Sequence, residues 1–153
     1  MFEDLFTSFY GESRELLTEM HGLAGQLRGV AIPDDRQAHI LAQLLQRLHR
    51  LIGGLAAIGF GMFAPVSRKT SLLAERSSML HGATITELMK NITAVLTELS
   101  VFFTSKERLR DIEVKVPDIE RRVDACMPLV SVQKPAITSQ DEIDDIMKMF
   151  GKV

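Results

Sequence analysis

The chain has 153 residues, of which 46% are hydrophobic and 25% are charged, and its 18 basic and 20 acidic side chains give a net charge of −2. That length is enough for one domain with a core and a tail, and the composition is that of an ordinary globular protein. Because the charge is nearly balanced, the chain has no electrostatic driving force for binding nucleic acid or an anionic membrane, and we exclude both as expected partners.

The first half of the chain predicts two helices. Residues 2–27 repeat apolar side chains at spacings of three and four, which is typical of one helical face. This N-terminus is acidic and lacks the apolar core of a secretory signal, so we expect a cytoplasmic protein. After a turn at Pro33, a second helix carries these apolar residues on one face: Leu41, Leu44, Leu45, Leu48, Leu51, Ile52 and Leu55. Arginines and glycines interrupt its most apolar stretch, which favours a core helix over a membrane span.

Two further helices are predicted between Pro65 and Phe103. Pro65 suits the first turn of the third helix, which we expect to end with Gly82 as its C-terminal cap. Thr84 and Glu87 form a capping-box pattern that predicts the start of the fourth helix. Four amphipathic helices joined by short loops predict an all-α fold, an up-and-down four-helix bundle.

The rest of the chain divides into three parts. Residues 105–130 are less regular, because apolar residues first alternate as in an extended segment and then favour a short helix that ends before Pro128. We interpret this part as a short, peripheral fifth element of a bundle formed by residues 1–130. Residues 131–138 are polar and contain a proline, which predicts a linker to a C-terminal peptide, residues 139–153.

No motif of a conventional enzyme class is present in the sequence. There is no phosphate-cradling glycine loop, no metal-ligand spacing and no nucleophile elbow. The single cysteine, Cys126, can form neither an intrachain disulfide nor a metal site, which suits a reducing compartment, and we expect it to be a buried apolar residue. The chain itself is therefore expected to bind no metal and no cofactor.

One histidine of the second helix stands out. At about 100° per residue, His49 lies roughly 100° from the centre of the apolar face, at its flank. Gly53 stands one turn beyond His49 on the same side, where it removes a side chain that would crowd the imidazole. A mid-helix glycine costs about 1 kcal/mol relative to alanine, and Gly53 is followed by Gly54, so we expect a compensating reason for the pair.

Residues 49–60, His-Arg-Leu-Ile-Gly-Gly-Leu-Ala-Ala-Ile-Gly-Phe, resemble the histidine motif of histidine-containing phosphotransfer (HPt) domains, especially that of CheA-type chemotaxis kinases. Residues 9–27 also resemble the first helix of that family, so the similarity covers about residues 1–104. The resemblance implies that His49 is the phospho-accepting residue, a nucleophile that exchanges a phosphoryl group with a receiver aspartate. It also implies a CheA-type kinase as a further partner. The family usually has lysine where this chain has Ile52.

The C-terminal peptide has a helical pattern of its own. Its apolar stripe consists of Ile143, Ile146, Met147 and Phe150. Its acidic residues are Asp141, Glu142, Asp144 and Asp145. The stripe follows the i, i+3, i+4, i+7 spacing, and the acidic residues suit the positive end of a helix. Because so short a helix is marginal in water, it needs a surface to lie on. That surface is either a groove on a partner or the chain's own bundle.

Residues 139–151 are similar to the CheY-binding peptides of CheZ-type phosphatases and of the flagellar switch protein FliM. The resemblance implies that the apolar stripe grips a CheY-type response regulator while the acidic residues meet basic groups around its groove. Mg²⁺ would then belong to the partner receiver and not to this chain.

Three mechanisms remain open at this stage. In the first, His49 exchanges phosphoryl groups with the tethered receiver. In the second, the body acts like a CheZ-type phosphatase, in which an amide orients a water; Asn91 with Glu87 has a suitable spacing, and Gln46 is an alternative amide. In the third, the protein is a non-catalytic adaptor. A homodimer is also left open, because CheZ-like proteins and some related bundles pair their helices.

Overall fold

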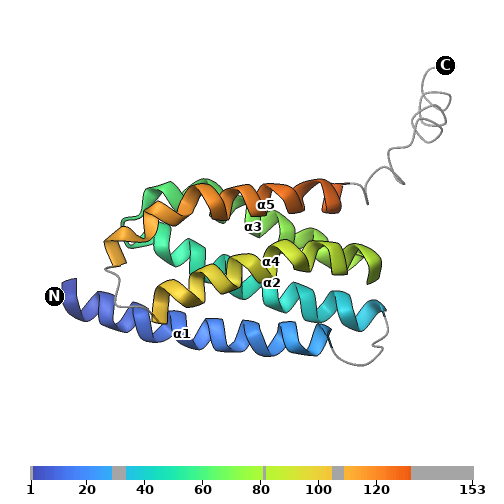
Figure 1. The fold of residues 1–153 in the computed structure, drawn as a ribbon, viewed down its shortest axis with the longest axis horizontal. Coiled ribbons are helices and arrows are strands. Elements are labelled where there is room, and N and C mark those ends of the chain that lie inside the picture. The colour runs from blue at the N-terminus through green and yellow to red at the C-terminus, as the bar shows by residue number, and fades with distance from the viewer. Residues whose placement is uncertain (1, 29–33, 81, 105–108, 132–153) are drawn as a thin grey trace, which may run out of the picture.

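The computed structural model describes residues 2–28, 34–80, 82–104 and 109–131. The regular secondary structure of this part of the chain consists of helices without a strand, which confirms the all-α prediction (Figure 1). The five α-helices are α1 (Phe2–Leu27), α2 (Asp34–Ala57), α3 (Ala64–Arg76), α4 (Gly82–Thr104) and α5 (Val116–Ser131). Three short 3-10 helices accompany them: η1 (Gly61–Phe63), η2 (Ser77–Met79) and η3 (Leu109–Lys115). Within the described ranges, no helix has the length and apolar character needed to cross a membrane.

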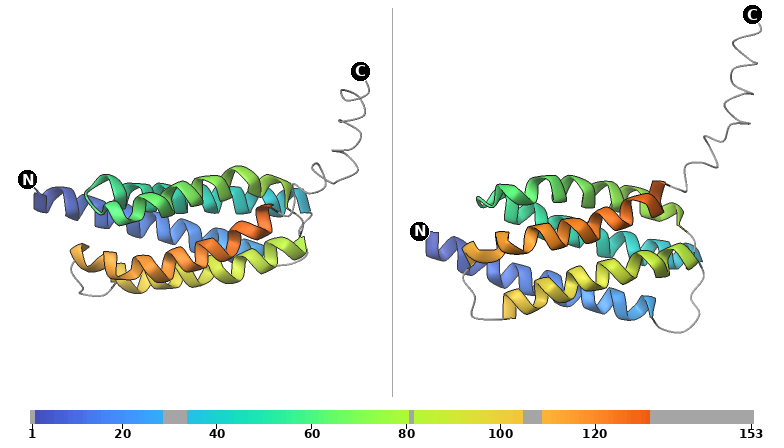
Figure 2. Two further views of the ribbon diagram at one scale, coloured as in Figure 1. Left: turned by 90° about the horizontal axis from the view of Figure 1, so that it is seen from above. Right: turned by 45° about the horizontal axis from the view of Figure 1, so that its top comes forward.

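The five helices lie side by side along the long axis (Figures 1 and 2), and the contacts between them form a closed ring. Helix α2 packs between α1 and α3, and α5 packs between α3 and α4. Helix α4 completes the ring against α1, and it also contacts α2 across the interior. The order around the ring is therefore α1, α2, α3, α5, α4, which differs from the order along the chain.

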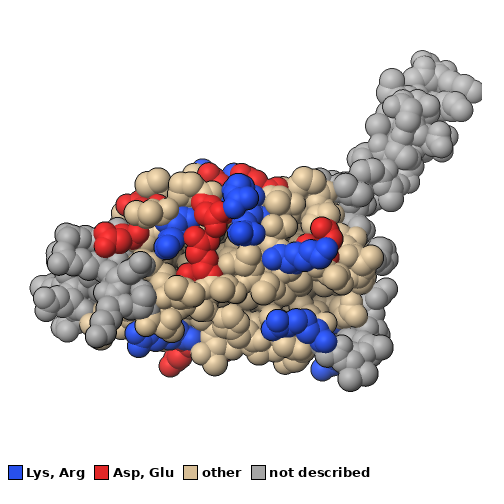
Figure 3. All heavy atoms as spheres, in the orientation of Figure 1, with Lys and Arg blue, Asp and Glu red and all other residues tan. Residues whose placement is uncertain are grey.

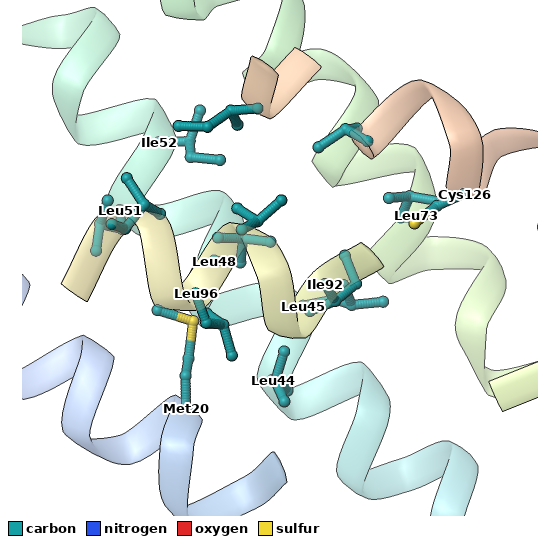
Figure 4. Close-up of a cluster of buried hydrophobic side chains, with 14 of the residues drawn as sticks. Met20, Leu44, Leu45, Leu48, Leu51, Ile52, Leu73, Ile92, Leu96 and Cys126 are labelled. Carbon is teal, nitrogen blue, oxygen red and sulfur yellow. The ribbon is translucent and has the colours of Figure 1, made fainter. Parts of the chain in front are cut away.

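The core fills the centre of this ring. All seven apolar residues predicted for the second helix are at most 1% exposed. Figure 4 labels Leu44, Leu45, Leu48, Leu51 and Ile52 of this set together with Met20 of α1, Leu73 of α3, Ile92 and Leu96 of α4, and Cys126 of α5. Full burial of one such side chain contributes about 1.5–3 kcal/mol. Every helix thus supplies side chains to a single core.

The fifth element differs from its sequence expectation. Residues 109–115 form a 3-10 helix and not an extended segment, and α5 has 16 residues with Pro128 inside it. The buried residues of this part follow a spacing of four, three, four, three, four: Ile112, Val116, Ile119, Val123, Cys126 and Val130. Helix α5 is consequently a full member of the ring and not a short peripheral piece.

The start of α4 also corrects a prediction. The helix begins at Gly82, so Gly82 opens α4 and does not cap the third helix, and Thr84 lies inside the first turn. The predicted capping box of Thr84 and Glu87 is therefore wrong. The Glu87 carboxylate accepts a hydrogen bond from Lys90 Nζ at 3.0 Å instead, and Thr86 Oγ1 donates to the Gly82 carbonyl oxygen.

Candidate functional site around His49

The imidazole of His49 lies half-buried between α2 and α3. Its Nδ1 is 2.9 Å from the Ser67 carbonyl oxygen and 3.3 Å from Thr70 Oγ1. A carbonyl oxygen can only accept, so Nδ1 carries the hydrogen of this bond. In the neutral ring, the lone pair then lies on Nε2, which no residue of the described ranges engages in a hydrogen bond. The site therefore leaves the Nε2 lone pair without a hydrogen-bond partner among the described residues.

Helix α3 holds that orientation with a buried hydroxyl. Thr70 is fully buried, and its Oγ1 donates to the Ser67 carbonyl oxygen at 2.8 Å. The same carbonyl oxygen thus accepts from both the hydroxyl and the imidazole. The buried Thr70 side chain has few alternative rotamers, so its hydrogen bond keeps the Ser67 carbonyl oxygen in place. The imidazole therefore faces a fixed acceptor.

The two glycines of α2 have a packing explanation. A Cβ at Gly53 would lie 3.3 Å from Ser67 Oγ and 4.0 Å from His49 Cε1. A Cβ at Gly54 would lie 2.9 Å from the Phe9 ring of α1. The pair therefore lets α3 and α1 approach α2 from two sides, and the space beside the imidazole is taken by Ser67. This close packing offsets the intrinsic cost of two glycines in a helix.

Basic residues adjoin His49 and Ser67 in the sequence. Ile52 is fully buried, so the position at which HPt domains usually have lysine faces the core. Arg50 and Arg68, the sequence neighbours of His49 and Ser67, are exposed. Lys69 is occupied by α5, because its Nζ is 2.7 Å from Asp124 and 3.4 Å from Glu120. The hydrogen bond with Asp124 is the main cause that raises the pKa of Lys69.

Of the other predicted residues, Gln46 shares α2 with His49, and Glu87 and Asn91 lie on another helix. Gln46 is exposed on α2, one turn before His49. Glu87 is exposed and Asn91 is half-buried, both on α4, which packs mainly on α5, α1 and α2. Since His49 faces α3, the structure gives two separate candidate sites: His49 at the seam of α2 and α3, and the pair of Glu87 and Asn91 on α4.

The pair on α4 faces the side of the helix that meets α5. Eleven residues after Glu87, helical periodicity brings Glu98 to nearly the same face. Burial is the first cause that raises the pKa of Glu98 to about 6, and a hydrogen bond with Asp118 of α5 is the second. The guanidinium of Arg121 is the main cause that lowers the pKa of Asp118 to about 2. In Figure 3, basic and acidic side chains alternate over this face without a patch of one sign.

Sequence reasoning missed Ser67 and Thr70. A signal was present, because Val66, Thr70 and Leu73 occupy the i, i+4, i+7 positions of the buried face of α3. A hydroxyl on the buried face of a helix is expected to have a hydrogen-bond partner in the interior. The Thr70 hydroxyl contacts His49 of α2 as well as the Ser67 carbonyl oxygen. No pattern within the third helix could have indicated the contact with His49.

The remaining sequence expectations concern the C-terminal peptide, metal ligands and Cys126. The eight tail residues predicted to bind a receiver, Asp141 to Met147 and Phe150, lie outside the described residues. In the described part of the chain, no three His, Cys, Asp or Glu residues are grouped so as to hold a metal ion. Cys126 is buried as expected, and burial raises the pKa of its thiol to about 12.

Comparison of the chain with protein-family models, with curated proteins and with solved structures found no match.

Proposed function

We propose that this protein is a cytoplasmic phosphotransfer protein of bacterial chemotaxis or two-component signalling, which exchanges phosphoryl groups with a CheY-type response regulator through His49. The observation that carries the proposal is the 2.9 Å hydrogen bond from Nδ1 to the Ser67 carbonyl oxygen, which leaves Nε2 as the nucleophile. In this proposal, α1 to α4 are the counterparts of the four helices of an HPt bundle, and α5 is inserted between α3 and α4.

The transfer step needs no group that the two proteins lack. The Nε2 lone pair attacks the phosphorus of the receiver's aspartyl phosphate, the bond from phosphorus to the aspartate oxygen breaks, and the carboxylate leaves with its electron pair. Nδ1 keeps its hydrogen, so the phosphorylated ring is cationic, and the Ser67 carbonyl oxygen stabilises that charge. The exposed Arg68, the sequence neighbour of Ser67, would offer positive charge to the phosphoryl oxygens. Mg²⁺ belongs to the receiver.

The C-terminal peptide brings the receiver to the body. Residues 139–151 would bind the receiver through their apolar stripe, and the linker 131–138 would keep the pair together. Tethering by a short flexible linker raises the local concentration to the millimolar range when the geometry permits. A CheA-type kinase is the second partner in this scheme.

The test follows a labelled phosphoryl group on a CheY-type receiver. Wild-type protein should take up the label, and His49→Gln should not. His39→Gln is the matched control, because His39 is an exposed histidine of the same helix whose Nε2 bonds Gln43 at 2.8 Å. Uptake of label by His49→Gln would overturn the proposal, as would uptake lost equally in both variants.

A second candidate, a CheZ-type phosphatase, is favoured by the place of Asn91. Cys126 Sγ of α5 is 3.8 Å from the Leu88 carbonyl oxygen of α4, so the end of α5 lies beside the helix that carries Asn91 and Glu87. A receiver held by the following peptide would meet this edge. In the same assay, the phosphatase would release free phosphate in His49→Gln and fail in Asn91→Ala, or in Gln46→Ala if that amide orients the water. Binding without transfer or release would indicate an adaptor.

A further inference from the structure

A groove lies between the end of α1, the start of α2 and the first half of α4. It has a volume of about 530 Å³. Its apolar lining comes from Leu27, Ile85 and Met89, of which Ile85 is buried and the other two are half-buried. Arg28 and Lys90 also line the groove, and both are exposed. The groove therefore combines an apolar floor with a cationic rim.

Arg28 and Lys90 can both meet an acidic ligand, Lys90 after exchanging its present partner. No ion pair joins Arg28 to any residue in the described ranges. Lys90 pairs with Glu87 at 3.0 Å, but both side chains are more than half exposed. Surface pairs of this kind contribute about 0–1 kcal/mol, so Lys90 can exchange its partner at little cost.

The chain contains one segment with the complementary pattern. Residues 139–151 carry an apolar stripe flanked by four acidic residues, Asp141, Glu142, Asp144 and Asp145. The apolar side chains match the floor of the groove, and the carboxylates match its rim. A groove of this volume accepts side chains of a short helix and is too small for a folded domain.

The start of that segment is close enough to reach the groove. Helices α4 and α5 run antiparallel (Figures 1 and 2), with Cys126 beside Leu88, and Ser131 follows only about 7.5 Å further along the axis. Between Ser131 and Ile143 the chain can span roughly 40 Å when extended. Crossing α4 to its other side requires only about 10–12 Å, the diameter of one helix.

We propose that residues 139–151 rest in this groove of their own chain when no partner is bound, with the apolar stripe on Ile85 and Met89 and the acidic residues near Arg28 and Lys90. A receiver must then displace the segment before it can bind. That last consequence rests on the proposed function, whereas the docking itself does not. Self-docking lowers the apparent affinity for the receiver by the fraction of segments that are free.

The absence of tryptophan from the sequence makes a direct test available. Phe150→Trp introduces a single tryptophan, and its emission in the full chain should lie at shorter wavelength than in the isolated 139–153 peptide with the same substitution. Lys90→Glu should move that emission back towards the value of the peptide. Arg121→Glu is the matched control, because both Lys90 and Arg121 are exposed and pair with an acid three residues earlier on their helix.

Each outcome decides the matter. Equal emission of full chain and peptide would overturn the proposal. An emission shift that survives both Lys90→Glu and Met89→Lys would also overturn it, because the segment would then lie elsewhere. A shift that disappears on dilution would overturn it too, because a second copy of the chain would then hold the segment. With Phe150 retained, Lys90→Glu should bind the receiver several-fold more tightly than Arg121→Glu. Failure of every variant to bind a receiver, with the emission results intact, would sink the proposed function alone.

Discussion

Glu98 of α4 and Asp118 of α5 meet at the seam between their helices, where the two carboxyl groups have opposite shifts. Burial and the neighbouring carboxylate favour the neutral form of Glu98, while arginine favours the charged form of Asp118. Below a pH of about 6, the protonated Glu98 can donate to the ionised Asp118. The contact between α4 and α5 therefore stabilises the folded state more in mildly acidic solution than at neutral pH.

This arrangement predicts a pH dependence of stability that one residue controls. The pKa of Glu98 is raised in the folded state from 4.5 to about 6, so its contribution is complete below pH 4.5 and is lost as the pH rises through 6. The lowered pKa of Asp118 has the opposite effect on stability, and it does so only at pH values below 3.8, the ordinary pKa of this group. The melting temperature should therefore fall by a few degrees between pH 4.5 and pH 7, and Glu98→Gln should remove that fall.

Thermal unfolding monitored by circular dichroism at a series of pH values measures this effect. Glu75→Gln is the control, since Glu75 is an exposed glutamate of α3. If Glu98→Gln and wild type lose stability in parallel over this range, the seam does not depend on the proton of Glu98.

Among the elements, α5 shows how a short pattern misleads. Ile112, Val114 and Val116 alternate, which predicts a strand, yet Val114 is 76% exposed. The longer series from Ile112 to Val130 has the helical period, but Pro128 lies within it and favours a helix that ends earlier. Pro117 suits the first turn, and Pro128 lies in the last part of the helix with an exposed side chain. Only the tertiary contacts with α3 and α4 decide between the two readings.

The membership of α5 in the core predicts unequal costs for two substitutions. Ile119→Ala removes a side chain with 0% exposure and should lower the free energy of unfolding by about 2–5 kcal/mol. Val114→Ala changes an exposed residue and should stay within about 0.5 kcal/mol of wild type. Urea denaturation measures both. Equal costs would mean that α5 packs loosely on the other helices.

For the whole molecule, the sequence predicted the helices better than their arrangement. All seven apolar residues predicted for α2 are buried, because periodicity within one helix reports burial directly, and the structure adds Ala38 and Ile40 to this face. The ring order and the partners of His49 depend on residues far apart in the chain: Ser67 and Thr70 are 18 and 21 positions away. Periodicity places His49 at a flank but cannot say that a carbonyl oxygen of the next helix faces it. The predicted receiver-binding peptide stays a prediction.

The closed ring predicts that the first four helices are not stable without the fifth. A fragment of residues 1–104 lacks α5 and leaves the facing sides of α3 and α4 uncovered. We expect it to keep helical circular dichroism, to bind a hydrophobic dye and to unfold without a sharp transition, as a molten globule does. A fragment that melts as cooperatively as the full chain would show that four helices suffice.

The order of the ring has a consequence during synthesis. The helix inserted between α3 and α4 is the last of the five to leave the ribosome. Until it emerges, the earlier helices have an incomplete interior, and their apolar flanks are open to other nascent chains or to chaperones. The bundle is therefore expected to reach its native state only after α5 has emerged, and in a single step, in place of gradual growth helix by helix.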